Sequence, residues 1–344
     1  MSVLRKRWRV YLPAFVFLAT HAAAGEWEQT LSYEIQSRTF WQGSRHVGQD
    51  TGGGFSASVQ PELYWSGDGG RHQAALVTFV RLDSQDPRRT HVDVREAYVG
   101  LEGDRWDAVF GFNKVFWGVA ESRHLVDVIN QTDLVEDVDG EQKLGQPMVN
   151  VNVDTDLGRF GLYVLPYFRE RTFPGRDGRL RPSLPVSRDA TYESDGAEWH
   201  PDIALRYGHY VGNVDFGLSV FDGTSREPVV YPDPTGARLV PHYEQMTQVG
   251  LDVQYTSGAW LWKLEGIGRS AESDSFLATV AGVEYTMYGL QESAVDVSVI
   301  VEALYDGRNH RAPPTVADKD AFRGMRVAPV SYTHLRAHET PLHL

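Results

Sequence analysis

Apolar and polar residues alternate with a period of two along most of the chain, and this period is the signature of β-strands. In the clearest example, between Val249 and Glu265, two alternating runs are joined by a turn of small residues at 257–259. This arrangement is typical of a β-hairpin with one apolar face and one largely polar face. The alternation fails around 95–97, where the two faces cannot be assigned. Similar runs predict strands at 26–39, 54–64, 72–82, 91–101, 106–116, 148–155, 160–169, 198–209, 213–222, 246–256, 260–269, 276–287 and 294–305, and a further segment that begins near Ala321.

The connections between the predicted strands alternate between short and long. Short turns at one membrane surface and long loops at the other are typical of outer-membrane barrels. A soluble sandwich has no physical reason to sort its connections in this way. The loops after the third and the eleventh predicted strands are short, so the rule holds as a trend. The long connections are 42–53, 118–147, 170–197 and 223–245, and the short ones are 66–71, 102–105, 155–159, 210–212, 257–259 and 288–293.

Aromatic residues gather at both ends of the predicted strands, where the interfacial girdles of a membrane barrel would lie. Unpaired backbone polar groups cannot face lipid, so a spanning sheet has to close on itself. We therefore predict an all-β protein, an antiparallel transmembrane up-and-down β-barrel of about 14 strands, or about 16 in a complete gene. One aromatic group near the short turns is Trp65, Trp106, Tyr210, Tyr255, Trp260 and Tyr288, and the group at the opposite ends is Phe40, Trp41, Phe116, Trp117, Phe168, Trp199, Phe221 and Phe276.

The two ends of the chain are predicted not to belong to the barrel. Residues 1–24 have the basic start, the short apolar run and the small-residue cleavage site of a secretory signal peptide. Residues from Val330 onward resemble a translated sequencing adapter, so we interpret 330–344 as an artefactual tail that truncates the barrel at its C-terminus. The expected organisation is therefore a signal peptide, an incomplete outer-membrane barrel at 25–329 and a tail. It implies Sec-type export to the outer membrane of a Gram-negative bacterium.

Composition excludes several other classes of protein. The formal net charge of −13 becomes −17 without the four cations of the predicted signal peptide, and such acidity argues against nucleic acid as a partner. The absence of cysteine removes disulfides and zinc–thiolate sites. No apolar run is long enough for a helical membrane span. The expected partners are outer-membrane lipid, lipopolysaccharide and small hydrophilic solutes, without a cofactor, and the sequence does not indicate an oligomeric state.

The polar faces of the predicted strands are expected to line the lumen. A barrel of this size leaves a space that side chains alone do not fill, so an aqueous pore is the expected outcome. The later strands contribute mainly carboxylates, which favours a weak preference for cations. The alternative is that the lumen charges pair with one another and that the acidity belongs to the loops. The predicted pore-lining residues are Arg81, Asp107, Asn113, Arg206, Asp252, Lys263, Glu265, Glu284, Asp296 and Glu302.

The segment 117–133 is the most distinctive part of the sequence. It begins with a Trp-Gly pair at 117–118 and ends with an Asp-Val-Ile-Asn-Gln-Thr-Asp run at 127–133, and an Arg-Glu-Ala-Tyr run at 95–98 precedes it. These motifs resemble a largely uncharacterised family of proteobacterial outer-membrane barrel proteins, in which comparable Arg-Glu-Ala-Tyr, Trp-Gly and Asp-Val-x-Asn-x-x-Asp segments follow one another. The resemblance covers about residues 90–170 and implies a porin-like barrel without a characterised chemistry.

The loop that contains this segment is too apolar to be a solvated tether, because five of its residues between Leu125 and Leu134 are large and aliphatic. We expect it to fold back into the barrel and narrow it, with its polar side chains facing the pore or binding lumen bases such as Arg95 or Lys114. The alternative is a loop packed on the barrel rim, with aspartates that cap turns. The candidate constriction-loop residues are Glu121, Asp127, Asn130 and Asp133.

Enzymatic and metal-binding roles find less support. Ser122 lies close in sequence to His124, and His200 to Asp202, but neither pair stands in a nucleophile motif. The acidic run 137–141 lacks the later ligands of a calcium loop. We therefore predict a porin-like channel for passive diffusion of small hydrophilic solutes, without catalytic or metal-binding residues. The alternatives are a lipid-acting barrel enzyme and a non-conducting structural or adhesion barrel.

Overall fold

The computed structural model describes residues 25–289 and 296–309 with their side chains, and the backbone of 3–12 and 324–330. Fifteen strands of this part form one large antiparallel sheet, and three short strands form a second sheet. Along the large sheet the order is β1 (Val3–Leu12), β2 (Gly25–Phe40), β3 (Gly54–Gly67), β4 (His72–Asp83), β5 (His91–Glu102), β6 (Trp106–Asn113), β7 (Gln146–Thr155), β8 (Gly158–Leu165), β10 (Asp202–Val211), β11 (Val214–Thr224), β14 (Gln245–Ser257), β15 (Trp260–Ala271), β16 (Ser275–Met287), β17 (Val297–Asp306) and β18 (Gly324–Val330). The small sheet joins β12 (Val229–Pro232), β13 (Leu239–Tyr243) and β9 (Thr191–Tyr192), and two short 3₁₀ helices are η1 (Asp68–Gly70) and η2 (Ala197–Trp199).

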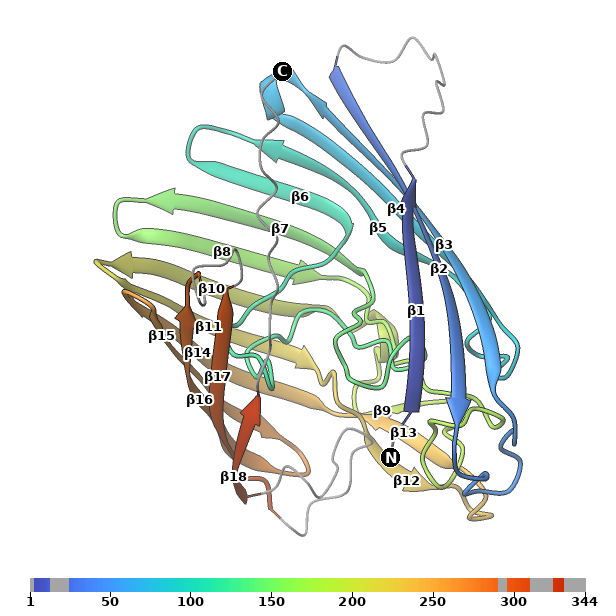
Figure 1. Cartoon of the computed structure of the whole chain (residues 1–344). Helices are drawn as coiled ribbons and strands as arrows, with labels where there is room; N and C mark the ends of the chain where they lie inside the picture. Colours follow the sequence, from blue (N-terminus) through green and yellow to red (C-terminus); the bar gives the residue numbers. More distant parts are fainter. Residues whose placement is uncertain (1–2, 13–24, 290–295, 310–323, 331–344) are drawn as a thin grey trace.

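Each strand of the large sheet pairs with the strands that precede and follow it in the sheet order, which gives an up-and-down topology. The sheet curves strongly, and Figure 1 shows the blue N-terminal strands facing β17 and β18 across an interior that loop segments enter. Thirteen of its strands lie between Gly25 and Asp306. Within the described residues, no pairing joins the two edge strands. The predicted all-β, antiparallel, up-and-down fold is confirmed, whereas closure of the barrel is not observed.

The first described strand falls in the segment that the sequence assigns to a signal peptide, and the last one reaches the first residue of the predicted tail. β1 lies within the predicted signal peptide, and residues 1–2 and 13–24 lie outside the described residues. β18 ends at Val330, and the remainder of the predicted tail, 331–344, also lies outside them. Cleavage of a signal peptide and the artefactual origin of the tail therefore stay predictions.

The predicted strands correspond to strands of the large sheet, with small changes at their ends. The strand predicted at 160–169 ends at Leu165, because the next residue, Pro166, has no N–H group for the ladder. The strand predicted at 198–209 likewise begins only after Pro201. The three strands of the small sheet were not predicted, since they are too short for a period of two to be recognised.

The apolar side chains of the large sheet point outward and many of its charged side chains point inward. In the hairpin of β14 and β15, Val249 and Trp262 are 54% and 50% exposed, whereas Asp252, Lys263 and Glu265 are 5%, 7% and 0% exposed. A soluble protein distributes these residue classes in the opposite way. The exposure pattern therefore fits a sheet whose outer face contacts lipid.

The alternation fails around Arg95 because the sheet is irregular at that point. Val77 pairs with Glu96 and Thr78 pairs with Val94, so Arg95 is an additional residue in β5. A β-bulge of this kind re-aims a side chain and shifts the faces of the strand. The extra residue places the Arg95 guanidinium beside carboxylates of the interior.

Five of the six rings predicted for the girdle near the short turns are exposed and the sixth, Trp65, is half-buried, whereas the other predicted girdle agrees only in part. At the ends of the long loops, Trp41, Phe116 and Trp199 are exposed, but Trp117 and Phe221 are buried. The assignment of these buried rings, and of Phe168, to an interfacial girdle is wrong, because the loops fold back and offer them an apolar core. Near the short turns the exposed rings are Trp106, Tyr210, Tyr255, Trp260 and Tyr288.

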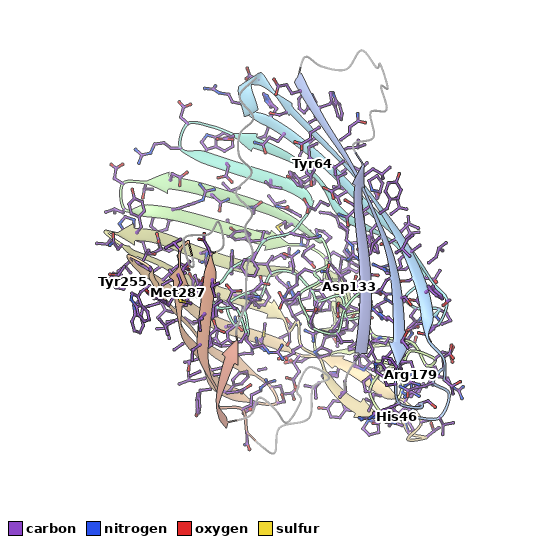
Figure 2. The ribbon with its side chains drawn as sticks, viewed as in Figure 1. His46, Tyr64, Asp133, Arg179, Tyr255 and Met287 are labelled. Carbon is purple, nitrogen blue, oxygen red and sulfur yellow. The ribbon has the colours of Figure 1, made fainter. Side chains whose placement is uncertain are left out.

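The long connections gather at one end of the sheet and the short turns at the other, as the sequence predicts. Figure 2 shows His46 and Arg179 at the loop end, Tyr64 and Tyr255 toward the turn end, and Asp133 in the interior. The small sheet lies at the loop end (Figure 1). The described residues contain no helix long and apolar enough to cross a membrane.

Candidate functional site

The connection between β6 and β7, residues 114–145, folds onto the inner face of the large sheet, and we call it the inner loop. Glu265 of β15 accepts three hydrogen bonds from backbone N–H groups of this loop, at 2.7 to 3.2 Å. Glu302 of β17 accepts two more, at 2.7 and 2.8 Å. Both carboxylates are fully buried, so these bonds are shielded from water. The donors are Val119, Ala120 and Val126 for Glu265, and Glu121 and Ser122 for Glu302.

A glycine permits the close approach of the inner loop to Glu265. Gly118 has a φ of +129°, a conformation that L side chains rarely adopt. A Cβ atom at this position would lie 2.6 Å from Glu265 Oε1. The Trp-Gly pair of the sequence motif therefore has a structural reason, since Trp117 packs in the core while Gly118 passes beside the carboxylate.

Apolar residues hold the same loop against the wall. Val126, Val128 and Ile129 are buried in one cluster with Trp117 and with inward side chains of the strands from β7 to β16. Burial of each large aliphatic side chain stabilises such packing by about 1.5–3 kcal/mol. The inner loop thus folds back into the interior rather than resting on the rim.

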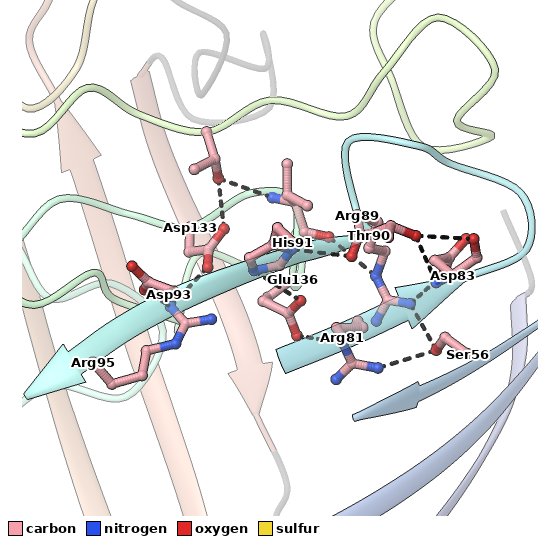
Figure 3. A network of polar contacts seen from close by, with 12 residues as sticks. Ser56, Arg81, Asp83, Arg89, Thr90, His91, Asp93, Arg95, Asp133 and Glu136 are labelled. Atoms are coloured by element: carbon pink, nitrogen blue, oxygen red, sulfur yellow. Dashed lines mark hydrogen bonds and ion pairs between the residues drawn. The ribbon is translucent and has the colours of Figure 1, made fainter. Parts of the chain in front are cut away.

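Two buried arginines join the inner loop to the wall formed by β2 to β5 (Figure 3). Arg81 Nε donates to Glu136 Oε2 at 2.9 Å, and Arg81 Nη2 donates to Glu34 Oε2 at 3.1 Å. Arg89 Nη1 donates to Asp83 Oδ2 at 2.6 Å, and its Nε donates to a carbonyl of the inner loop at 3.2 Å. Burial raises the pKa of Glu136 above its ordinary value, although the charges of Arg81 and Arg89 act in the opposite direction.

The bulge residue Arg95 also joins this wall to the inner loop (Figure 3). Its Nη1 atom lies 2.8 Å from Asp133 Oδ2 and 3.2 Å from Asp93 Oδ2. Thr172 donates to the other oxygen of Asp133 at 2.6 Å. Burial alone would raise the pKa of Asp133, but the charge of Arg95 and these hydrogen bonds outweigh it and hold the pKa below its ordinary value. The expected contact between a loop carboxylate and Arg95 is therefore present.

The other candidate constriction-loop residues divide into two kinds. Glu121 reaches the wall, where its Oε1 atom lies 2.9 Å from Lys263 Nζ. Asp127 instead pairs with Lys143 of the same loop at 3.1 Å. Asn130 is buried, and its side chain bonds to backbone groups at the two ends of the loop. Asp127 and Asn130 thus stabilise the loop itself.

Most of the predicted pore-lining charges have partners on the inner face. Arg206 pairs with Asp252 at 2.7 Å, and Lys263 pairs with Glu284 at 3.2 Å. The alternative in which the lumen charges pair with one another describes these residues well. Among the others, Arg81, Glu265 and Glu302 hold the inner loop, Asp107 pairs with Arg159, Asn113 accepts from Lys114 N, and Asp296 accepts from Gly289 N at the turn.

A cavity of about 750 Å³ lies between the inner loop, the longer connections and the inner wall of β15 and β16. Its lining joins apolar wall residues such as Ile267 and Phe276 with many guanidinium groups. The arginines that line it are Arg45, Arg123, Arg171, Arg179, Arg181, Arg226, Arg269 and Arg308.

Several residues that build this site are absent from the sequence prediction. Arg89, Glu136 and Arg171 lie in connections, where no periodicity assigns an inward or outward face. One signal was available, because the run 169–188 holds six arginines, a density that a solvated loop of an acidic protein does not require.

Within the described residues, no hydrogen bond joins Ser122 to His124 or His200 to Asp202, the two pairs considered from the sequence. Within the described residues Ser122 Oγ has no hydrogen-bond partner, and His124 Nε2 faces Glu141 at 3.3 Å. His200 Nδ1 lies 3.6 Å from Asp202, whose carboxylate also binds Arg226. The described part of the chain contains no group of three or more His, Cys, Asp or Glu side chains that could hold a metal ion.

Comparison with known proteins gives likenesses of fold. No protein-family model and no curated protein matches the chain. A high-pH structure of OprB from Pseudomonas putida is similar at a TM-score of 0.43 and 11% identity, covering 82% of this chain and 76% of that one. OmpT, an outer-membrane protein of Vibrio cholerae folded in vitro and seen in its trimer form, is similar at a TM-score of 0.46 and 13% identity, covering 85% and 81%. No family assignment follows from these values.

Proposed function

We propose that this protein is a porin-like channel of the bacterial outer membrane that lets small hydrophilic solutes diffuse passively. The observation that supports the proposal is the inverted sheet, with Val249 and Trp262 outside and Asp252, Lys263 and Glu265 inside. An apolar outer face is stable only against lipid or another apolar surface. A charged inner face, hydrated or paired, is what an aqueous path through such a sheet needs.

The contacts of the inward carboxylates no longer support the weak cation preference predicted from the sequence. It rested on inward carboxylates, of which Asp252 pairs with Arg206 and Glu284 pairs with Lys263. Glu265 and Glu302 accept hydrogen bonds from the inner loop. The arginine-rich cavity instead favours anions at the loop end of the path. A reversal potential toward cations in a salt gradient would contradict this revised selectivity.

The tightly held inner loop favours a second candidate, a non-conducting barrel whose interior is filled. Glu265 and Glu302 contribute five hydrogen bonds to this loop, and the apolar cluster packs it further. A liposome-swelling assay separates the two candidates. Vesicles that contain the folded protein should swell in isotonic arabinose and more slowly in larger sugars. If they swell no faster than protein-free vesicles in any sugar, the channel proposal fails and the filled barrel stands.

A further inference from the structure

The cavity at the loop end carries an excess of positive charge. Within the described residues its lining holds nine cationic side chains, the eight arginines and Lys143, against five carboxylates. This excess is unexpected in a chain whose net charge is −13. Three of the arginines, Arg45, Arg179 and Arg181, donate hydrogen bonds to neutral oxygens. The lining therefore holds more guanidinium groups than carboxylates, although Arg226 and Arg308 also pair with Asp202 and Asp306.

Two of these arginines converge on a single carboxylate oxygen. Arg269 Nη1 and Arg308 Nη1 lie 3.3 and 3.5 Å from Glu227 Oε2. Both guanidinium groups also lie 5.5 Å from the ring centroid of Phe276. Burial raises the pKa of Glu227, but the charges of four arginines outweigh it and hold the pKa below its ordinary value. Arg308 also pairs with Asp306, so two carboxylates face the four arginines whose charges act on Glu227.

Arg171 adds a further positive charge to the cavity. Its side chain lines the cavity and is 9% exposed, and its Nε atom donates to the amide oxygen of Gln131 at 3.2 Å. Among the residues that the structure describes, no carboxylate forms an ion pair with Arg171. A buried guanidinium is costly unless an anion or several acceptors stabilise it. The planar fork of arginine matches the two oxygens of a carboxylate or the oxygens of a phosphate.

We propose that this cavity is a binding site for small solutes that carry a carboxylate or phosphate group, with Arg171 and Arg269 as the anion-binding residues. The proposal rests on the proposed channel function, because the solute would reach the cavity from the aqueous path. The volume of about 750 Å³ accommodates a solute of a few to about twenty heavy atoms together with water. Ile267 and Phe276 offer apolar contacts to the carbon skeleton of such a solute.

A phosphate group could also come from the lipid surface, but the position of the cavity favours a free solute. Ile267 and Ala278 line the cavity and belong to the buried inner cluster, whereas the side chains next to them in the strands, such as Leu277, are exposed on the outer face. The wall of β15 and β16 therefore separates the cavity from lipid. Inorganic phosphate and succinate are suitable probes of the free-solute class.

Isothermal titration calorimetry on the full chain in detergent micelles at low salt tests the proposal. Wild type should bind phosphate and succinate and should not bind glucose. Arg269→Gln should weaken binding roughly tenfold, because one charged hydrogen bond is lost. Glu227→Gln should strengthen it, because the competing carboxylate is removed. Arg71→Gln, which removes one positive charge at an exposed turn, is the matched control and should bind as wild type does.

The opposite signs expected for the two cavity variants separate a site from a purely structural role, since misfolding would weaken both. Folded wild type that binds neither probe would overturn the proposal, as would equal affinity in Arg269→Gln and Arg71→Gln. Dodecyl phosphate micelles serve as the lipid-like probe. If the protein binds these micelles but binds neither phosphate nor succinate, the site is assigned to lipid and the free-solute proposal is refuted. Conductance without anion binding would refute only this site, whereas anion binding without conductance would refute only the channel.

Discussion

Release of the inner loop is the perturbation that the structure predicts in most detail. Glu302 holds Glu121 N and Ser122 N with its two oxygens, at 2.8 and 2.7 Å. In Glu302→Gln one oxygen remains an acceptor, but the other is replaced by an NH₂ group that faces an N–H donor. The variant therefore loses one hydrogen bond to a charged group, which is worth about 1.5–3 kcal/mol. Glu265→Gln loses the bond to Val126 N for the same reason.

Hydrogen exchange reports this loss directly, because exchange of the loop amides tracks the free energy of local opening. The peptides that cover 117–126 should exchange roughly 10- to 100-fold faster in either variant. Asp252→Asn is the matched control, since it removes a buried carboxylate that pairs with Arg206 and does not contact the loop amides. Wild-type protection of the loop in both Glu265→Gln and Glu302→Gln would refute the anchoring role of these carboxylates.

Three further outcomes follow from the same contacts. Gly118→Ala should speed exchange of the inner loop, because its Cβ would meet Glu265 Oε1 at 2.6 Å, whereas Gly43→Ala, with open space around it, should not; equal exchange in the two variants would contradict the contact. Leu218→Arg places a charge on the outer face in the middle of β11 and should lower the free energy of unfolding in vesicles by about 2–4 kcal/mol, and an unchanged urea midpoint would argue against lipid contact there. The pKa of Asp133 lies below its ordinary value of 3.8, so its stabilising effect is present at neutral pH and is lost as the pH falls below that value toward the folded-state pKa. Protection of the inner loop against hydrogen exchange should therefore drop in this acid range in wild type. Asp133→Asn should show weaker protection at pH 7 and no further drop in the acid range. A drop that persists in this variant would assign the pH dependence to another group.

The strands could be predicted from sequence because each of them has to place apolar side chains on one face and polar side chains on the other, which gives a period of two. Val249 and Trp262 face outward while Lys263 and Glu265 face inward, and this alternation needs no knowledge of the partner strand. The lengths of the connections also indicated at which end of the sheet the long loops lie. The faces could not be assigned at Arg95, where one additional residue shifts them, because a bulge can be located only when the register of the neighbouring strand is known.

The inner site was harder to predict because its contacts join distant parts of the chain. Glu121 N and the Glu302 carboxylate are 181 residues apart in sequence, and Arg81 and Glu136 are 55 apart. The inward positions of Glu265 and Glu302 could be recognised from the alternation, but their loop donors could not, because backbone N–H groups carry no sequence signature. The role of Arg171 was equally hidden, since it depends on the fold of several connections around one cavity.

Single-channel recording in planar lipid bilayers tests the central claim most directly. The folded full chain should give discrete current steps whose size rises with salt concentration, with a reversal potential shifted toward anions in a salt gradient. Folded protein that inserts into the bilayer and gives no ion-dependent steps would contradict the channel.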